Sequence, residues 1–353
     1  MALTDLWYVA LPARDLPRGR LVHRRLDGQP VVFGRDAATG KAFALRDLCP
    51  HRGVPLSKGR MVEGAIECPY HGWRIAPDGR CARIPSLLPE QQFETERIRV
   101  RTYAVREQYG LIWVYLGDRP GAQPADNADA AEPPEFPALP LDAQPRHVET
   151  MVFAGDIDHV VIGLIDPAHV AFVHNLWWWR APKSIRTKEK AFAPSDLGFT
   201  MVRHKPSSNS AAYKLLRGEV STEIAFRLPG VRIEHIQMDR PGKRAEHFVG
   251  VTMLTPMDGN NTLVHHAIYW TWPLLNLVKP MLPYFARTFL GQDRKVVAMQ
   301  AEGLRDEPDL MLVNDADVQA KWYYRLKREW QQSRAEGRAF QNPVDARVLR
   351  WQS

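Results

Sequence analysis

Short apolar and alternating runs fill the first 116 residues of the chain. The runs QPVVFG at 29–34, AFALRD at 42–47 and IRVRTYAVREQYGLIWVYLG at 98–117 end at glycine or aspartate. Runs of this length and composition are typical of β-strands, and the PDG at 77–79 is typical of a hairpin turn. The first part of the chain is therefore predicted to be all-β.

A stretch without periodic apolar positions follows. Residues 117–146 are rich in proline, alanine and aspartate, which predicts an extended linker. Beyond it, EHFVGVTMLTPMDGNNTLVHHAIYWTW at 246–272 predicts a hairpin whose turn is MDGNNT. We therefore expect a first domain at 1–116, a linker at 117–146 and a second domain at 147–353.

Composition is that of an ordinary globular protein long enough for two cores, with 353 residues of which 45% are apolar and 25% charged. The net charge of +7 comes without a run of lysine and arginine, so we expect no nucleic-acid partner. The chain start has no signal-peptide architecture, and three cysteines cannot build a disulfide framework. These features favour a cytoplasmic protein.

The longest apolar stretch is WPLLNLVKPMLPYFARTFLG at 272–291. Asn276, Lys279, Arg287 and internal prolines interrupt it, so we expect no membrane span here. A buried or pocket-covering helix is the favoured interpretation, and a helix lying on a membrane surface is the alternative.

Two loops each combine one cysteine with one histidine. LCPHRGVPL contains Cys49 and His51, and IECPYHGW contains Cys68 and His71. Two mixed pairs suit a binuclear centre in which one iron takes both sulfurs and the other takes both histidines, as in a Rieske [2Fe–2S] cluster. Prolines and glycines in both loops tighten the chain so that backbone amides can turn toward sulfur. A zinc site and two unrelated turns are the alternatives.

A second group of candidate metal ligands lies at 166–174. Asp166, His169 and His174 are spaced by three and five residues in an apolar setting. A continuous α-helix would place the two histidines about 140° apart at about 100° per residue, so the helix must loosen or end near Phe172 if both bind one ion. Pro167 predicts a helix start with Asp166 near the N-cap. The alternative is that Asp166 only caps and the histidines only pack.

The segment CPHRGVPLSKGRMVEGAIECPYHGWRIAPDGRCARIPS resembles the Rieske segment of ring-hydroxylating and demethylating Rieske oxygenases. It is less similar to respiratory Rieske proteins, whose loops carry two further cysteines where this chain has Val54 and Tyr70. Cys81 is interpreted as a buried small residue. The resemblance implies an α+β chain: an all-β Rieske domain followed by a helix-grip catalytic domain with a curved antiparallel sheet.

The same resemblance implies a mononuclear Fe(II) held by His169, His174 and a downstream aspartate at the start of a long helix. Asp293 in GQDRKVVAMQAEGL occupies that place. Other acids nearby, which look more like surface charges, are Glu302, Asp306, Glu307 and Asp309. In the family, subunits form a head-to-tail homotrimer in which the second Rieske histidine, here His71, reaches the neighbour's bridging aspartate, here Asp166. Relatives often carry asparagine three residues before that aspartate, where this chain has Gly163.

The substrate pocket is the least specified part of the sequence. Candidate pocket residues are Phe172, Trp177, Trp178, Trp179, His204, Asn209, Tyr213, His247, His266 and Trp270. Strand alternation turns only about half of the strand residues inward. The run Trp177–Trp179 suits either a pocket entrance or a subunit interface.

The resemblance implies a terminal oxygenase that demethylates or hydroxylates an aromatic or related hydrophobic small molecule with O2. Ring dihydroxylation and a non-catalytic Rieske electron carrier are the alternatives. The sequence contains no GxGxxG after a predicted strand, so we expect electrons from a separate NAD(P)H-dependent reductase or a ferredoxin. Basic residues near the cluster loops that could meet an acidic partner are Arg52, Lys58, Arg60 and Arg74.

Overall fold

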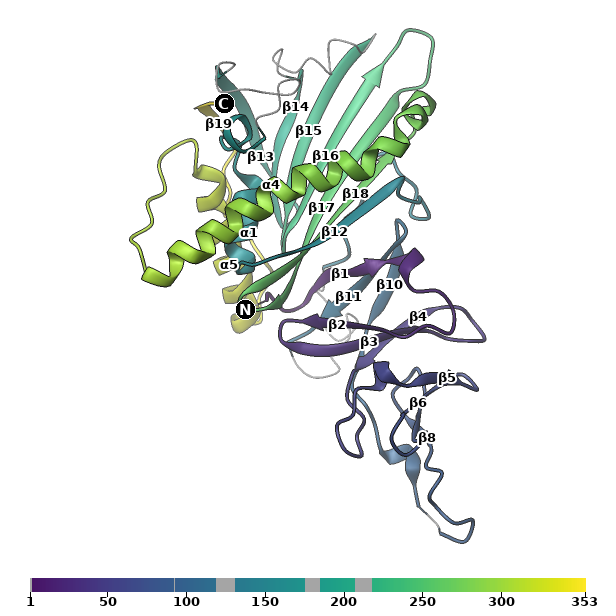
Figure 1. Ribbon diagram of the computed structural model, residues 1–353. Helices are drawn as coiled ribbons and strands as arrows, with labels where there is room; N and C mark the ends of the chain where they lie inside the picture. The colour runs from purple at the N-terminus through teal and green to yellow at the C-terminus, as the bar shows by residue number, and fades with distance from the viewer. Residues whose placement is uncertain (1, 92, 119–130, 175–184, 207–217) are drawn as a thin grey trace. The chain divides into compact units, whose positions relative to one another are not determined.

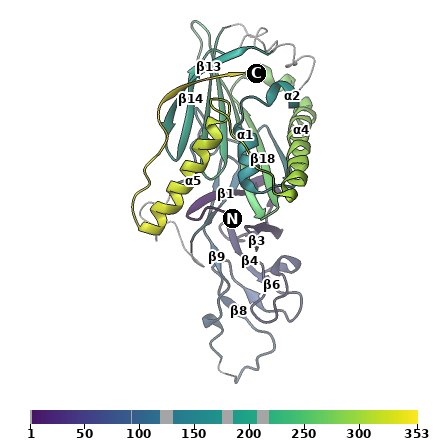
Figure 2. The ribbon, with the colours of Figure 1, turned by 90° about the vertical axis from the view of Figure 1, so that its left-hand side faces the viewer.

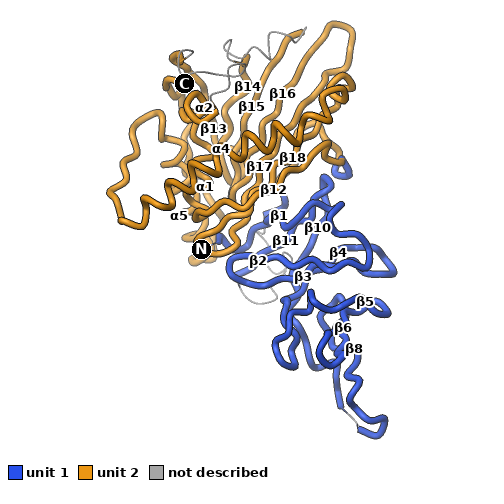
Figure 3. Tube along the Cα trace, in the orientation of Figure 1, with its two compact units in different colours: residues 1–133, 141–143 blue, residues 134–140, 144–353 orange. Residues whose placement is uncertain are grey.

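The structure, a computed structural model, describes residues 2–91, 93–118, 131–174, 185–206 and 218–353. The chain forms two compact units, Met1–Pro133 with Leu141–Ala143, and Pro134–Pro140 with Gln144–Ser353 (Figure 3). The chain passes between them inside the stretch expected to be a linker. Part of this stretch is packed into the second unit, because Phe136 is buried and its ring meets that of Tyr269 at 5.7 Å.

Within its described residues, the first unit contains three antiparallel sheets. The first contains β1 (Leu6–Pro12), β11 (Leu111–Leu116) and β10 (Val105–Gln108). The second contains β2 (Val22–Leu26), β3 (Gln29–Arg35), β4 (Ala42–Arg46) and β9 (Thr102–Tyr103). The third contains β5 (Arg60–Val62), β6 (Ala65–Glu67), β7 (Arg74–Ile75) and β8 (Cys81–Arg83). The prediction of an all-β first part is confirmed.

One antiparallel sheet of eight strands dominates the second unit (Figure 1). In spatial order its strands are β12 (His147–Phe153), β18 (Asn261–Trp270), β17 (Glu246–Asp258), β16 (Val231–Asp239), β15 (Glu219–Arg227), β14 (Gly198–His204), β13 (Thr187–Ser195) and β19 (Arg347–Gln352). The predicted hairpin is β17–β18, in which Asp258 pairs with Asn261 at the turn.

Helices cover one side of this sheet (Figures 1 and 2). They are α1 (Ile157–Ile165), the single turn α2 (Val170–Val173), α4 (Leu282–Gly303) and α5 (Val318–Glu336). At one edge, Arg287 of α4 binds Glu149 of β12 at 3.2 Å, and toward the other edge Trp322 of α5 packs on Phe199 of β14 at 5.2 Å. The predicted combination of an all-β first part with helices over an antiparallel sheet is confirmed.

Two helix boundaries differ from the prediction. Asp166 ends α1 instead of starting a helix, because a residue before proline favours extended backbone and Asp166 has φ −63° and ψ 122°. The next helix starts at Val170, with His169 at its N-cap. Asp293 lies near the middle of α4, which begins at Leu282 with Pro283 in its first turn.

Candidate metal centres

The two cysteine–histidine loops of the first unit share one backbone design. In the first, the amide of Cys49 donates to the Val54 carbonyl at 2.8 Å, and the amide of Gly53 donates back to Cys49 at 2.9 Å. In the second, Cys68 donates to Trp73 at 2.8 Å and Gly72 donates back to Cys68 at 3.1 Å. The glycines have φ of +71° and +69°, a conformation that side chains disfavour. Each loop therefore presents its cysteine and histidine from the same kind of turn.

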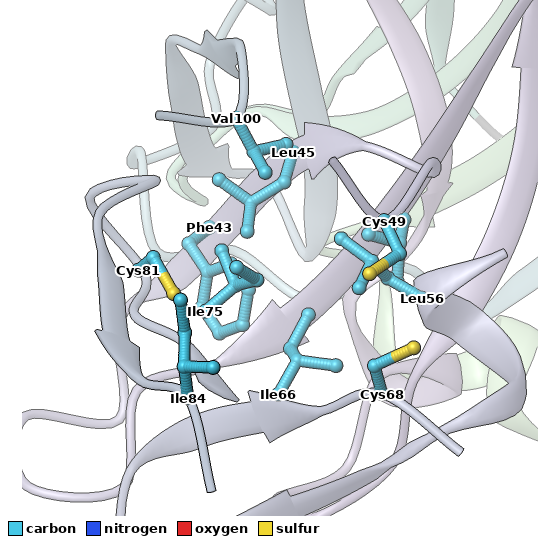
Figure 4. Packing of buried hydrophobic residues seen from close by; sticks show 11 residues of the cluster. Phe43, Leu45, Cys49, Leu56, Ile66, Cys68, Ile75, Cys81, Ile84 and Val100 are labelled. Atoms are coloured by element: carbon cyan, nitrogen blue, oxygen red, sulfur yellow. The ribbon is translucent and has the colours of Figure 1, made fainter. Parts of the chain in front are cut away.

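The donor groups of these loops differ in burial. Cys49 and Cys68 are 4% and 3% exposed within a hydrophobic cluster that also contains Ile66 and Leu56 (Figure 4). Burial, with the neighbouring thiol of Cys68, raises the pKa of Cys49 to about 11. Two neighbouring thiols in an apolar setting suit a metal site, because the positive charge of a metal ion favours the thiolate form.

The two histidines lie at the exposed end of the site. The ring centroids of His51 and His71 are 4.6 Å apart, and the His51 ring stacks on Trp73 at 4.7 Å. Partial loss of water around the ring and the neighbouring His71 lower the pKa of His51, which favours the neutral imidazole that binds metal. Two buried thiols and two exposed imidazoles fit a Rieske [2Fe–2S] cluster with its histidine side toward solvent. Cys81 is fully buried, as predicted, and its thiol contacts the Arg83 carbonyl at 3.7 Å.

A second donor group lies in the second unit. His169, His174 and Asp293 each offer one ligand atom, and these atoms all lie within 4.8 Å of one another. The histidines stand at the two ends of α2, and the backbone of His174 leaves the helix with φ −95° and ψ 44°. The helix thus ends just after Phe172, as the predicted geometry required. Two imidazoles and one carboxylate are the donor set of a mononuclear ferrous site.

Both imidazoles are oriented by further side chains. His174 Nδ1 lies 2.9 Å from Gln292 Oε1, so it donates to this acceptor and leaves Nε2 facing Asp293 Oδ1 at 3.2 Å. His169 Nε2 lies 3.9 Å from the same carboxylate oxygen. Gln292 was not singled out from the sequence, since only its place beside Asp293 distinguishes it from other polar helix residues.

Asp166 lies behind His169. Its Oδ1 accepts from the amide of Ala168 at 2.7 Å, and its Oδ2 lies 3.5 Å from His169 Nδ1. That nitrogen is buried and has no hydrogen-bond partner within bonding distance among the described residues. The carboxylate therefore closes the turn with one oxygen and faces the imidazole with the other.

One row of paired strand residues runs beneath the helices. Its members, each directly opposite the next, are Glu149, His266, Thr252, Arg232, Phe226 and Phe199. Since Glu149 binds α4 and Phe199 packs on α5, this row defines the helix-facing side of the sheet.

Two predicted pocket histidines lie on this side. His266 Nδ1 and the Thr252 hydroxyl share a hydrogen bond of 2.9 Å. Burial lowers the pKa of His266 to about 4, although the negative charge of Asp293 acts to raise it. Burial also lowers the pKa of His204, with Glu234 opposing this shift. Glu234 and Arg232, neither of which was predicted to line the pocket, form an ion pair at 3.2 Å.

Other predicted pocket residues lie elsewhere. His247 is an odd number of residues from Thr252 on the same strand, so it lies on the opposite side of the sheet. There its Nδ1 lies 3.0 Å from His235 Nε2. Phe172 is 62% exposed, since α2 buries Ala171 instead. Trp270, by contrast, lies four residues from His266 on β18 and therefore shares the helix-facing side; it is buried, and its indole donates to Asn276 Oδ1 at 3.0 Å. The remaining candidates, which lie outside the described residues, are Trp177, Trp178, Trp179, Asn209 and Tyr213.

Comparison with known proteins supports the assignment of the first unit. A family model described as the Rieske [2Fe–2S] domain matches residues 6–103. Chlorophyllide a oxygenase, chloroplastic, of Chlamydomonas reinhardtii is 36% identical over 190 residues, covering 52% of this chain and 27% of that protein. The oxygenase subunit of 3-chlorobenzoate-3,4-dioxygenase of Comamonas testosteroni is 32% identical over 176 residues, covering 49% and 38%.

The fold extends over almost the whole chain of a solved structure. The crystal structure of dicamba monooxygenase bound to dicamba has a TM-score of 0.72 at 20% identity, covering 95% of this chain and 99% of that one. The chain spans between 27% and 55% of the length of the curated relatives it matches. The predicted [2Fe–2S] domain and fold are thus confirmed: the chain carries a Rieske [2Fe–2S] domain, is similar over about half of its length to proteins named as oxygenases, and shares the fold of dicamba monooxygenase.

Proposed function

We propose that the chain is the terminal oxygenase component of a Rieske system, acting with O2 on an aromatic or related hydrophobic small molecule. The observation that carries the proposal is the donor set of His169, His174 and Asp293 in the same chain as a Rieske domain. An electron-transfer protein would need only the first centre. Monooxygenation, as demethylation or hydroxylation, is the favoured reaction.

The proposed ligands follow from the two donor groups. Cys49, His51, Cys68 and His71 would hold the [2Fe–2S] cluster, and His169, His174 and Asp293 would hold Fe(II). When bound, the ferrous ion supplies an open coordination position for O2 chemistry, and the cluster supplies electrons. Gln292 fixes the His174 ring through Nδ1, so that Nε2 points at the ion position.

The helix-facing side of the sheet supports a hydrophobic substrate with a polar group. His266 is a neutral imidazole at physiological pH, because burial lowers its pKa to about 4. Its ring can exchange one hydrogen bond with a substrate oxygen while Thr252 holds the other ring nitrogen. Ile236 and Ile268 share this side of the sheet and offer apolar contact.

Transfer between centres is proposed to follow the homotrimeric arrangement of the family. His71 of one copy would meet Asp166 of the next, and Asp166 already faces His169 Nδ1 with Oδ2. A separate reductase or ferredoxin would supply the electrons. Arg60 and Arg74 both bind Glu67, so docking of an acidic partner would depend on the exposed Arg52 and Lys58.

Ring dihydroxylation remains the second candidate, since one relative is named a dioxygenase subunit. The test uses the purified chain with a competent reductase and a panel of methoxy-aromatics, N-methyl compounds and polycyclic acids. Substrate-dependent oxygen uptake with stoichiometric formaldehyde would establish demethylation, and a cis-diol product would establish dihydroxylation. Reduction of the cluster without substrate-dependent oxygen uptake on any compound would contradict the oxygenase proposal for this panel.

A further inference from the structure

The segment before α4 and the first turn of α4 expose a row of apolar side chains spaced by one to three residues. Leu277 is 76% exposed, Tyr284 71% and Leu274 59%, and Met281 and Val278 are also exposed. The expectation of a buried helix is therefore wrong for residues 273–284, which leaves a pocket-covering helix and a helix on a membrane surface as the two interpretations. The reason is that two 3₁₀ turns hold its shape through the backbone, with bonds such as Val278 amide to Leu275 carbonyl at 3.2 Å, which leaves the side chains outside.

Positive charge surrounds this row. The sequence from Thr271 to Gln292 contains Lys279 and Arg287 but no aspartate or glutamate. The turn between β16 and β17 adds the exposed Lys243 and Arg244, and both features lie at the same end of the sheet (Figure 1).

Contacts join the residues that flank the turn to Thr271 and Trp272, which directly precede the apolar row. The amide of His247, just after the turn, donates to the Thr271 hydroxyl at 2.9 Å. The Arg240 guanidinium lies 5.5 Å from the centre of the Trp272 ring. Two of the nearby acids are already paired, since Glu246 binds Arg240 at 2.6 Å and Glu149 binds Arg287 at 3.2 Å. The exposed Asp239 accepts from the Gln237 amide at 3.0 Å, and Lys243, Arg244 and Lys279 together outweigh its charge.

We propose that this apolar-basic face, made of Leu274, Leu277, Val278, Met281 and Tyr284 with Lys243, Arg244 and Lys279, docks on the surface of an anionic phospholipid bilayer. Apolar side chains on a short amphipathic element enter the headgroup boundary, and surrounding cations bind anionic lipid. None of the helices in the described ranges is both long and apolar enough to span a membrane.

The positive charge of this face favours binding to an anionic lipid surface. Anionic headgroups complement these charges, whereas a second copy that presented the same face would bring like charges together. A head-to-tail contact with another face of a second copy is the competing occupant that light scattering distinguishes. A second exposed apolar group provides the contrast. Leu310, Met311 and Val313 are exposed, but the acids around them are Asp306, Glu307, Asp309 and Asp315. The same lipid would repel that group.

Docking here goes beyond the proposed function and does not depend on it. Together with the proposed function, docking through this face would bring the bilayer near the candidate iron site. Tyr284 and Asp293 lie on the same helix, α4, about 14 Å apart along its axis at about 1.5 Å per residue. An apolar substrate dissolved in the bilayer would have a short path to that site.

The test is flotation of the full cluster-loaded chain with vesicles of phosphatidylcholine, with or without phosphatidylglycerol. We expect binding to the phosphatidylglycerol vesicles and weakening by salt. The double variant Leu277→Asp/Tyr284→Asp should bind at least about tenfold more weakly, because each aspartate must enter the headgroup boundary. Lys243→Ala and Arg244→Ala should each weaken binding about fivefold.

Met311→Asp is the matched control, since Met311 is 84% exposed, and it should bind like the parent chain. The cluster absorption and the melting temperature verify folding, and Leu277→Ser/Tyr284→Ser replaces the double aspartate variant if that one does not fold. Absence of binding by the parent chain at low salt would overturn the proposal, as would unchanged binding of the double variant. A smaller assembly of the double variant in light scattering would overturn it in favour of a second copy on this face.

Discussion

The two candidate metal centres are built in opposite ways. In the first unit, each loop brings its own cysteine and histidine within a few residues, and a positive-φ glycine closes the same turn in both loops. In the second unit, His169 and His174 stand at the ends of the single turn α2, and Asp293 comes from α4. The first centre depends on local turns, whereas the second depends on tertiary packing of α4 against the sheet.

Because of this difference, substitutions that disrupt one metal centre should leave metal binding at the other intact. Substitutions in the cluster loops act on a site within the first unit, and substitutions at α2 or α4 act within the second. If the centres are independent in metal binding but coupled in electron transfer, single variants should remove one centre and leave the other spectroscopically intact.

The largest effect is expected for Cys68→Ser. Loss of one of two buried thiolates should abolish the Rieske electron paramagnetic resonance signal and all turnover, because the cluster needs both sulfurs. Cys81→Ser is the control, since Cys81 is buried in the same apolar cluster but is not a proposed ligand. An unchanged signal in Cys68→Ser would remove the ligand assignment.

The next effect is expected for His169→Ala. Turnover should fall by more than about 100-fold. Even the loss of a residue that only orients a metal ligand lowers metal affinity or activity by about 10- to 100-fold, and His169 is itself a proposed ligand. The spectrum of the reduced cluster should stay as in the parent chain. Activity near that of the parent would mean that the iron site has been misplaced.

Asp166→Asn tests the coupling between the centres. We expect both metals to be retained and single-turnover product formation in the pre-reduced enzyme to slow by about 10- to 100-fold, because the amide loses the charge that faces His169. The competing role is closure of the turn through Ala168, which an amide oxygen can still perform. Product formed at the parental rate would leave Asp166 with that role alone.

A smaller effect is expected for Gln292→Leu, which removes the acceptor for His174 Nδ1. Iron affinity of the second site should fall by about tenfold, as measured by competition with a chelator. Gln300→Leu, in the exposed part of the same helix, is the control. Equal affinities in the two variants would show that Gln292 does not orient the ligand.

The smallest effect concerns Gly163, where the family often has asparagine. The residue lies inside α1, and a Cβ built there meets no atom within 4 Å. Gly163→Ala should therefore stabilise the folded chain by about 1 kcal/mol, as alanine does in helix interiors, measured by denaturant unfolding. Destabilisation would mean that the open space is required.

The sequence predicted the cluster loops because ligands, prolines and glycines lie side by side in them. Asp293 was reached through the family resemblance, since no local pattern separates it from the acids at 302–309. The resemblance implied that Asp293 lies at a helix start, whereas it lies near the middle of α4. The helix already begins at Leu282, because proline at position 283 fits the first turn of a helix.

The pocket was the hardest part to predict. Alternation gives two sides of a strand but does not say which side faces the helices, so His266 and His247 looked equivalent although they lie on opposite sides. The exposed segment 273–284 was misjudged for a related reason. An apolar stretch predicts burial by default, and only the packing shows that Leu277 and Tyr284 have nothing to cover them among the described residues.

The most direct test of two separate metal centres in one chain is the ratio of iron to acid-labile sulfide in the purified, iron-reconstituted protein. The account predicts about three irons for every two sulfides, because the cluster contributes two irons with its sulfides and the second site contributes one more. A ratio of about two irons to two sulfides, in protein whose cluster spectrum is complete, would contradict it.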